Sequence, residues 1–113
     1  MARQNSSEFV DHLHEVFEAF GPVDSRRMFG GYGIYHDDLM FALVAYDTVY
    51  LKADAESSAR FEDAGLEQFE YVKNGKPMKM SYYAAPEAIF DDPDEAKFWA
   101  TLAYEAALRS RKK

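Results

Sequence analysis

The chain has 113 residues, close to the commonest size of one domain, and it has no cysteine, which excludes disulfides, thiolate zinc sites and cysteine nucleophiles. Acidic side chains outnumber basic ones by 20 to 13, and the net charge of −7 disfavours direct binding to nucleic acid, which normally requires a basic surface. No signal peptide and no membrane-spanning stretch is visible, so we expect a single cytoplasmic domain over residues 1–113.

The first expected element is an amphipathic helix. Its apolar side chains recur at intervals of three and four residues and therefore share one face: Phe9, Val10, Leu13, Val16, Phe17 and Phe20. Asn5 or Ser6 can cap the start of this helix, and Gly21-Pro22 is a typical ending.

The pattern then becomes that of strands, which we expect at Val23–Phe29, Tyr32–His36, Leu39–Ala45 and Val49–Ala53. Leu39–Ala45 is apolar on both faces, which indicates a central position in the sheet. Asp37-Asp38 fits a two-residue turn. His36 and these aspartates could form part of a metal site, but a solvated hairpin tip is the simpler interpretation of His36.

The middle of the chain predicts a short helix and a hairpin. Asp54 is suited to cap a helix that runs to about Ala64, with Gly65 as its left-handed terminator. Asn74-Gly75 then joins two strands, at Phe69–Lys73 and Met78–Tyr83, and this dipeptide is the strongest short hairpin signal because both of its residues adopt positive φ.

A last helix is expected from Asp92, with Pro93 at its first position and Glu95 at its third. Capping explains these acidic residues more simply than a cation site does. The order is a helix, three or four strands, a helix, two strands and a helix, which indicates a two-layer α+β domain with antiparallel strands.

Two surface features are candidate binding sites. The first is an arginine- and glycine-rich run: Arg26, Arg27, Met28, Phe29, Gly30, Gly31, Tyr32 and Gly33. A phosphate-binding loop would lead into a helix, whereas this run leads into a strand, so the glycines are better explained by a tight corner and close packing. The second is a basic hairpin with Lys73, Lys76 and Lys79. No catalytic constellation, metal site or cofactor motif is apparent.

Four separated blocks resemble the N-terminal domain of the TfoX/Sxy family. They are Arg-Arg-Met-Phe-Gly-Gly-Tyr-Gly-Ile-Tyr (26–35), Met-Phe-Ala-Leu-Val (40–44), Tyr-Leu-Lys (50–52) and Gly-Lys-Pro-Met-Lys-Met-Ser-Tyr-Tyr (75–83). The resemblance implies an α-β(3)-α-β(2)-α fold, similar to the secretion-chaperone-like architecture. It covers the chain from about Glu8 to Arg109, and the second, C-terminal domain of full-length members is missing.

The resemblance implies a non-enzymatic regulatory role. Full-length members are transcriptional co-regulators of natural competence, thought to work with the cyclic-AMP receptor protein. We therefore expect a protein-interaction module whose partner belongs to the transcription machinery, with the Arg26–Gly33 run as its contact. One alternative is a small-molecule sensor or enzyme with a pocket lined by Tyr and Met. Another is nucleic-acid binding through the Lys73–Lys79 hairpin and the basic C-terminus, which the acidic balance makes the weakest of the three. A homodimer is a further expectation, because small sheets of this kind often pair.

Overall fold

The computed structural model describes residues 6–28, 31–45 and 48–111. Its elements, in chain order, are α1 (Ser6–Val16), β1 (Asp24–Met28), β2 (Gly31–His36), β3 (Leu39–Ala45), β4 (Thr48–Lys52), α2 (Ser58–Asp63), β5 (Gln68–Lys73), β6 (Lys76–Ala84), the 3-10 turn η1 (Glu87–Phe90) and α3 (Pro93–Arg111). None of the helices described is both long enough and apolar enough to cross a membrane.

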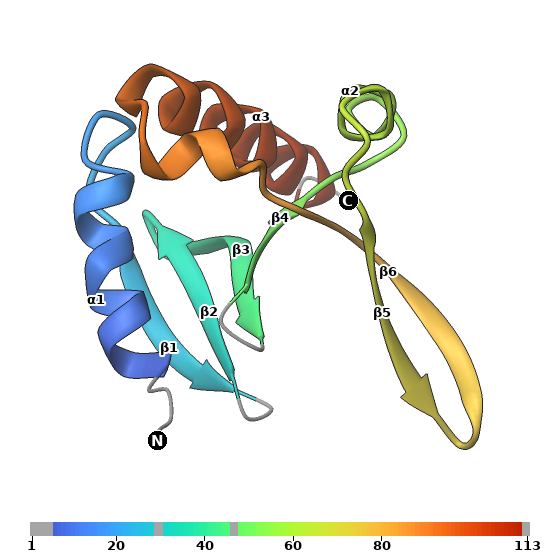
Figure 1. Ribbon diagram of the computed structural model, residues 1–113. Coiled ribbons are helices and arrows are strands. Elements are labelled where there is room, and N and C mark those ends of the chain that lie inside the picture. Colours follow the sequence, from blue (N-terminus) through green and yellow to red (C-terminus); the bar gives the residue numbers. More distant parts are fainter. Residues whose placement is uncertain (1–5, 29–30, 46–47, 112–113) are drawn as a thin grey trace.

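The strands form one antiparallel six-stranded sheet in the order β1-β2-β3-β4-β6-β5, with α1 and α3 on one side of it (Figure 1). The predicted α+β class and the central position of β3 are confirmed. Four strands precede α2, as the residues predict, which is one more than the resemblance implies. The additional strand, β1, lies at an edge of the sheet, and β5 lies at the other edge.

Both predicted two-residue turns are present. Asp37 and Asp38 have φ values of 51° and 66°, and Asn74 and Gly75 have values of 54° and 79°, so all four turn positions adopt the left-handed conformation that such hairpins require. Aspartate and asparagine tolerate this conformation better than other residues with side chains. The turns fix the pairing of the residues next to them. A bulge in each pair, between Ile34 and Tyr35 in β2 and between Gln68 and Glu70 in β5, then shifts the register further along the strands.

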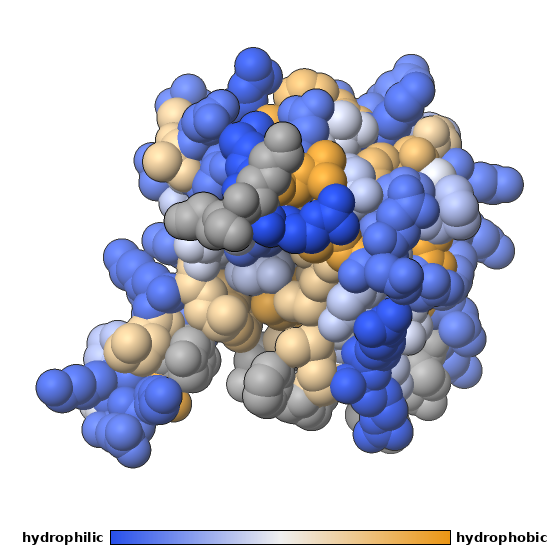
Figure 2. Space-filling view, turned by 180° about the vertical axis from the view of Figure 1, so that it is seen from behind, coloured by the Kyte–Doolittle hydropathy of each residue, from blue (hydrophilic) through white to orange (hydrophobic). Residues whose placement is uncertain are grey.

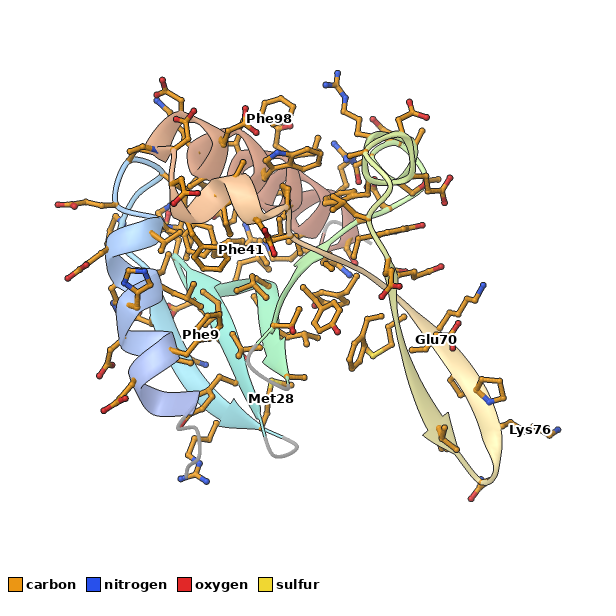
Figure 3. The ribbon with its side chains drawn as sticks, viewed as in Figure 1. Phe9, Met28, Phe41, Glu70, Lys76 and Phe98 are labelled. Carbon is orange, nitrogen blue, oxygen red and sulfur yellow. The ribbon has the colours of Figure 1, made fainter. Side chains whose placement is uncertain are left out.

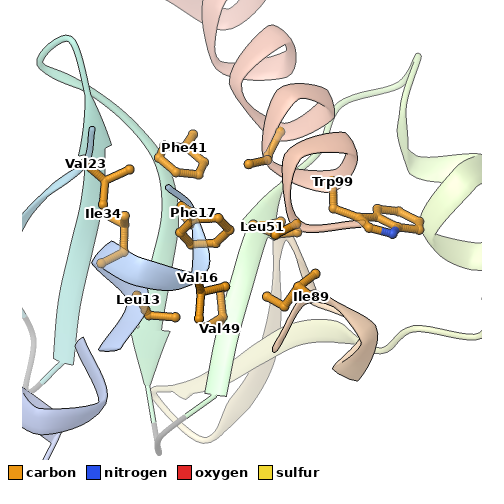
Figure 4. Close-up of a cluster of buried hydrophobic side chains, with 14 of the residues drawn as sticks. Leu13, Val16, Phe17, Val23, Ile34, Phe41, Val49, Leu51, Ile89 and Trp99 are labelled. Atoms are coloured by element: carbon orange, nitrogen blue, oxygen red, sulfur yellow. The ribbon is translucent and has the colours of Figure 1, made fainter. Parts of the chain in front are cut away.

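The hydrophobic core lies between the sheet and the helices. Figure 4 shows buried side chains of α1, β2, β3, β4, η1 and α3 in this core, among them Leu13, Ile34, Phe41, Leu51, Ile89 and Trp99. Phe17, which follows α1, lies among them. The apolar face predicted for the first helix is confirmed, but α1 ends at Val16, earlier than expected. The next residues form tight turns, in which the amide of Gly21 donates to the carbonyl of Phe17 at 3.0 Å, and Phe17 still packs against Phe41.

The start of the second helix differs from the prediction. The helix begins at Ser58, with Ser57 rather than Asp54 at the N-cap position. The Asp54 carboxylate instead accepts hydrogen bonds from the amides of Glu56 and Ser57, which builds a turn before the helix. It also binds Arg109 of α3 with two hydrogen bonds, of 2.6 and 3.0 Å. Asp54 therefore ties the chain before α2 to the last turns of α3, a contact between residues 55 positions apart.

Replacement of Asp54 by asparagine is expected to destabilise the protein and to remove part of its acid sensitivity. The hydrogen bond from Arg109, opposed by burial and aided by Ser57, lowers the pKa of Asp54 from 3.8 to about 2. With the carboxylate 26% exposed, solvent screening reduces the corresponding stabilisation to about 1–2 kcal/mol. It is complete above the unfolded pKa of 3.8 and is lost as the pH falls towards 2. Urea unfolding of the wild type and of Asp54→Asn at pH 7, 4 and 2.5 measures the difference in the free energy of unfolding. Asp63→Asn, which changes an exposed aspartate, is the control. An equal difference between the wild type and Asp54→Asn at all three pH values would contradict the prediction.

Candidate protein-binding face

One of the two faces of the sheet carries none of the described helices. Residues opposite one another in neighbouring strands share a face, and the register aligns Ile34, Ala42, Leu51 and Tyr83, which are all buried on the helix side. The adjacent row must point away from the helices, because successive side chains in a strand point to opposite faces. It consists of Gly33, Leu43, Tyr50 and Ala84. We call this second side the helix-free face.

The side chains on the helix-free face are mainly aromatic, methionine and basic: Arg26, Met28, Tyr35, Met40, Leu43, Tyr50, Lys52 and Tyr82. Figure 2 looks onto the molecule from behind, with the β5–β6 hairpin protruding at the lower left and apolar side chains in pale orange beside it. Leu43 and Tyr82 on this face are buried, Arg26 is exposed, and the other side chains are half-buried. The face is therefore a partly covered surface of aromatic, methionine and basic groups.

Two glycines of the predicted site are required by close packing. A Cβ on Gly31 would lie 2.1 Å from the carbonyl oxygen of Val44 in β3, so only glycine fits there. A Cβ on Gly33 would lie 2.7 Å from the sulfur of Met40 and 2.9 Å from that of Met28. Gly33 thus makes room for two methionines on the helix-free face. Close packing at Gly33 is confirmed. Gly31, which was expected at a corner between strands, lies in β2 against the backbone of β3. Phe29 and Gly30 lie outside the described residues.

The two arginines of the predicted site point in opposite directions. Arg26 lies opposite Gly33 and belongs to the helix-free face, where its guanidinium stacks 4.3 Å from the centre of the Tyr35 ring and donates to Asp38 at 3.2 Å. Arg27 lies opposite Tyr32, on the other side of the same edge strand. It is exposed, and no described carboxylate lies within ion-pairing distance of it. The two guanidinium groups therefore belong to different surfaces, and they can be tested separately.

The basic hairpin projects from the body of the molecule, with Lys76 near its tip (Figure 3). Lys73 and Lys76 face each other beside the turn, and Lys79 lies opposite Glu70. All three lysines are exposed. The hairpin also exposes Val72, at 74%, so its surface is mixed in character.

The interpretation of His36 as part of a solvated hairpin tip is wrong. The His36 side chain is only 18% exposed, and its ring packs against Phe20 and Tyr104, with centroids 4.8 and 5.0 Å away. Its Nδ1 is hydrogen-bonded to the carbonyl oxygen of Pro22 at 2.7 Å. The residues after α1 fold back over the end of β2, and no local signal in the sequence predicts that contact. Across the described ranges, His, Asp and Glu side chains form no group of three or more that is suited to a metal ion.

Several residues of the helix-free face were not singled out from the sequence. Tyr35, Met40, Lys52 and Tyr82 belong to it by register. The available signal was the spacing of two residues within each strand, which relates Arg26 to Met28 and Gly33 to Tyr35. The alignment of one strand with the next depends on a bulge between Ile34 and Tyr35, which spacing alone does not reveal.

Comparison with known proteins agrees with the motif blocks. The TfoX N-terminal domain family matches residues 15–107. The chain is 35% identical over 88 residues to the DNA transformation protein TfoX1 of Aliivibrio fischeri. This match covers 74% of this chain and 42% of TfoX1. It is 25% identical over 97 residues to the protein Sxy of Escherichia coli, and this match covers 86% of this chain and 46% of Sxy. The match spans less than half the length of either relative. The chain belongs to the TfoX N-terminal domain family.

Proposed function

We propose that this protein is a non-enzymatic regulatory module that binds a protein of the transcription machinery through the helix-free face. The observation that carries the proposal is the position of the family motif. Arg26, Met28 and Gly33 lie together on the side of the sheet without a helix. A sheet face that presents aromatic, methionine and arginine side chains has the composition that is enriched at protein interfaces.

The relatives support the regulatory part of the proposal. One of them is named a DNA transformation protein, and both contain the matched region as part of a longer chain. A domain that recurs within longer chains is suited to act by binding another protein. The excess of 20 acidic over 13 basic side chains favours a protein over a nucleic acid as the partner. The proposed role is therefore that of a co-regulator in competence, acting from the cytoplasm.

Reversal of the charge at Arg26 is expected to weaken partner binding, whereas the same change at Arg27 is not. Both arginines are exposed in β1, so neither Arg26→Glu nor Arg27→Glu should disturb the fold, but only Arg26 belongs to the helix-free face. Affinity capture from native cells, read by mass spectrometry, identifies the partner. Titration of the purified pair should then show binding weakened about tenfold or more by Arg26→Glu, which corresponds to about 1.4 kcal/mol.

The control variant makes the two outcomes distinct. Arg27→Glu has the same charge change one residue away on the opposite face, and should bind as the wild type does. Equal losses in both variants would indicate a general electrostatic effect and would contradict docking on the helix-free face. Capture of no protein of the transcription machinery by the wild type would contradict the regulatory role itself.

A further inference from the structure

A lysine that has no acidic partner among the described residues lies in the middle of the helix-free face. Lys52 of β4 is opposite Tyr82 of β6, and its Nζ lies 5.1 Å from the centre of the Tyr82 ring. No described carboxylate is within ion-pairing distance of Lys52, although the chain has 20 acidic residues. The half-buried ammonium of Lys52 therefore has no described carboxylate to balance its charge, and it can bind an anion.

The Tyr82 hydroxyl also has no hydrogen-bond partner among the described residues. Tyr82 is only 6% exposed, and no hydrogen bond joins its hydroxyl to the described residues. Burial, with a further contribution from Tyr35, raises the pKa of Tyr82 to about 12. The neighbouring Tyr83, on the other side of the sheet, donates its hydroxyl to Glu62 at 2.7 Å. Since buried hydroxyl groups normally have partners, the difference indicates that Tyr82 is placed to donate to a ligand.

Tyr35 and Arg26 complete the surroundings. Tyr35 lies on the same face and contributes to the raised pKa of Tyr82, and Arg26 stacks on the Tyr35 ring. Asp38 pairs with Arg26 at 3.2 Å and offsets its charge. The net charge of this cluster is therefore about +1, from Lys52 and Arg26 less Asp38. It matches the charge of one carboxylate better than that of a phosphate, which is about −1.5 to −2.

We infer that Lys52, Tyr82 and Tyr35 form a carboxylate-binding site, which receives an aspartate or glutamate side chain of the protein partner. The ammonium of Lys52 supplies the charge, and the phenol hydroxyls of Tyr82 and Tyr35 donate hydrogen bonds to the carboxylate oxygens. The methionines around Gly33 give apolar contact beside the site. The identity of the ligand as a partner side chain rests on the proposed function, whereas the carboxylate chemistry rests on these side chains alone.

The test is an NMR titration of the purified protein with sodium acetate, compared with sodium chloride at equal ionic strength. The ring signals of Tyr82 and Tyr35 and the ε-methylene signal of Lys52 should shift saturably with acetate and not with chloride. Lys52→Met and Tyr82→Phe should each weaken the acetate response about tenfold or more. Lys97→Met, which removes an exposed lysine of α3, is the matched control and should respond as the wild type does.

Two results would overturn the site. One is the absence of a saturable acetate response at Tyr82 and Lys52. The other is a tighter response to inorganic phosphate than to acetate, which would contradict the assignment to carboxylates. Thermal unfolding adds a separate check. Tyr82→Phe should leave the Tm unchanged, because no described residue hydrogen-bonds to its hydroxyl, while Tyr83→Phe, which removes the hydrogen bond to Glu62, should lower it. Because the titration needs no partner, failure of the proposed function in the capture experiment is distinguishable from failure of the site.

Discussion

Replacement of Gly31 by alanine is expected to destabilise the fold by about 3 kcal/mol or more. The added Cβ would overlap the backbone carbonyl oxygen of Val44, at 2.1 Å, where β2 and β3 approach each other. A backbone carbonyl in a central strand cannot turn away as a flexible side chain can. Separation of these strands would disturb the Tyr32–Val44 pair and the buried row beside it. Urea unfolding followed by circular dichroism measures the loss.

The matched control for this substitution is Gly33→Ala in the same strand. Its Cβ would meet the sulfur atoms of Met28 and Met40 and the ring of Tyr35. These are outer parts of side chains, and methionine adapts readily to a new neighbour. Gly33→Ala should therefore cost less than Gly31→Ala. A Gly31→Ala protein as stable as the wild type would show that the strands are not as close as described.

Truncation of Phe61 to alanine is expected to cost about 3–5 kcal/mol, the usual range for a buried phenylalanine. Phe61 is fully buried, and it is the buried residue by which α2 is anchored to the core. Its ring stacks on Tyr83, with centroids 5.2 Å apart and 15° between the planes, and it contacts Trp99 at 5.1 Å. Loss of the ring would leave a cavity between α2, β6 and α3. Chemical denaturation gives the free energy of unfolding.

Phe98→Ala provides the comparison for the same change of residue type. Phe98 is 44% exposed on α3, with Arg60 5.7 Å from its ring centre. Phe98→Ala should lower the free energy of unfolding by well below half as much as Phe61→Ala does, because little of the Phe98 ring is buried in the core. Similar losses for Phe61→Ala and Phe98→Ala would contradict the assignment of Phe61 as the anchor of α2.

Much of the fold could be predicted from local signals. The period of three and four residues identified the face of α1 that packs on the sheet, and the positive-φ dipeptides located both tight hairpins. Asp92 caps α3, as predicted, because its carboxylate accepts the amide of Asp94 at 2.9 Å. Each of these signals is contained within a few residues of the element that it specifies, so tertiary packing had little opportunity to override it.

The features that escaped prediction depend on contacts between distant residues. Asp54 has the side chain of a helix cap, but Arg109 binds its carboxylate from the other end of the domain. His36 has the surroundings of a surface turn in the sequence, but Phe20 and Tyr104 cover it. The helix-free face is a further example, because its members come from five strands. Register and layer order bring them together, and neither is encoded in a short motif.

The most direct test of partner binding by the helix-free face is site-specific photo-crosslinking in native cells. A photoreactive phenylalanine analogue replaces Tyr35 on the helix-free face in one strain and the exposed Phe98 on α3 in another, so both changes exchange one aromatic side chain for another. Docking on the helix-free face predicts a crosslinked protein of the transcription machinery from position 35 and none from position 98. Crosslinking of that protein from position 98 alone would contradict this account and place the contact on the helices.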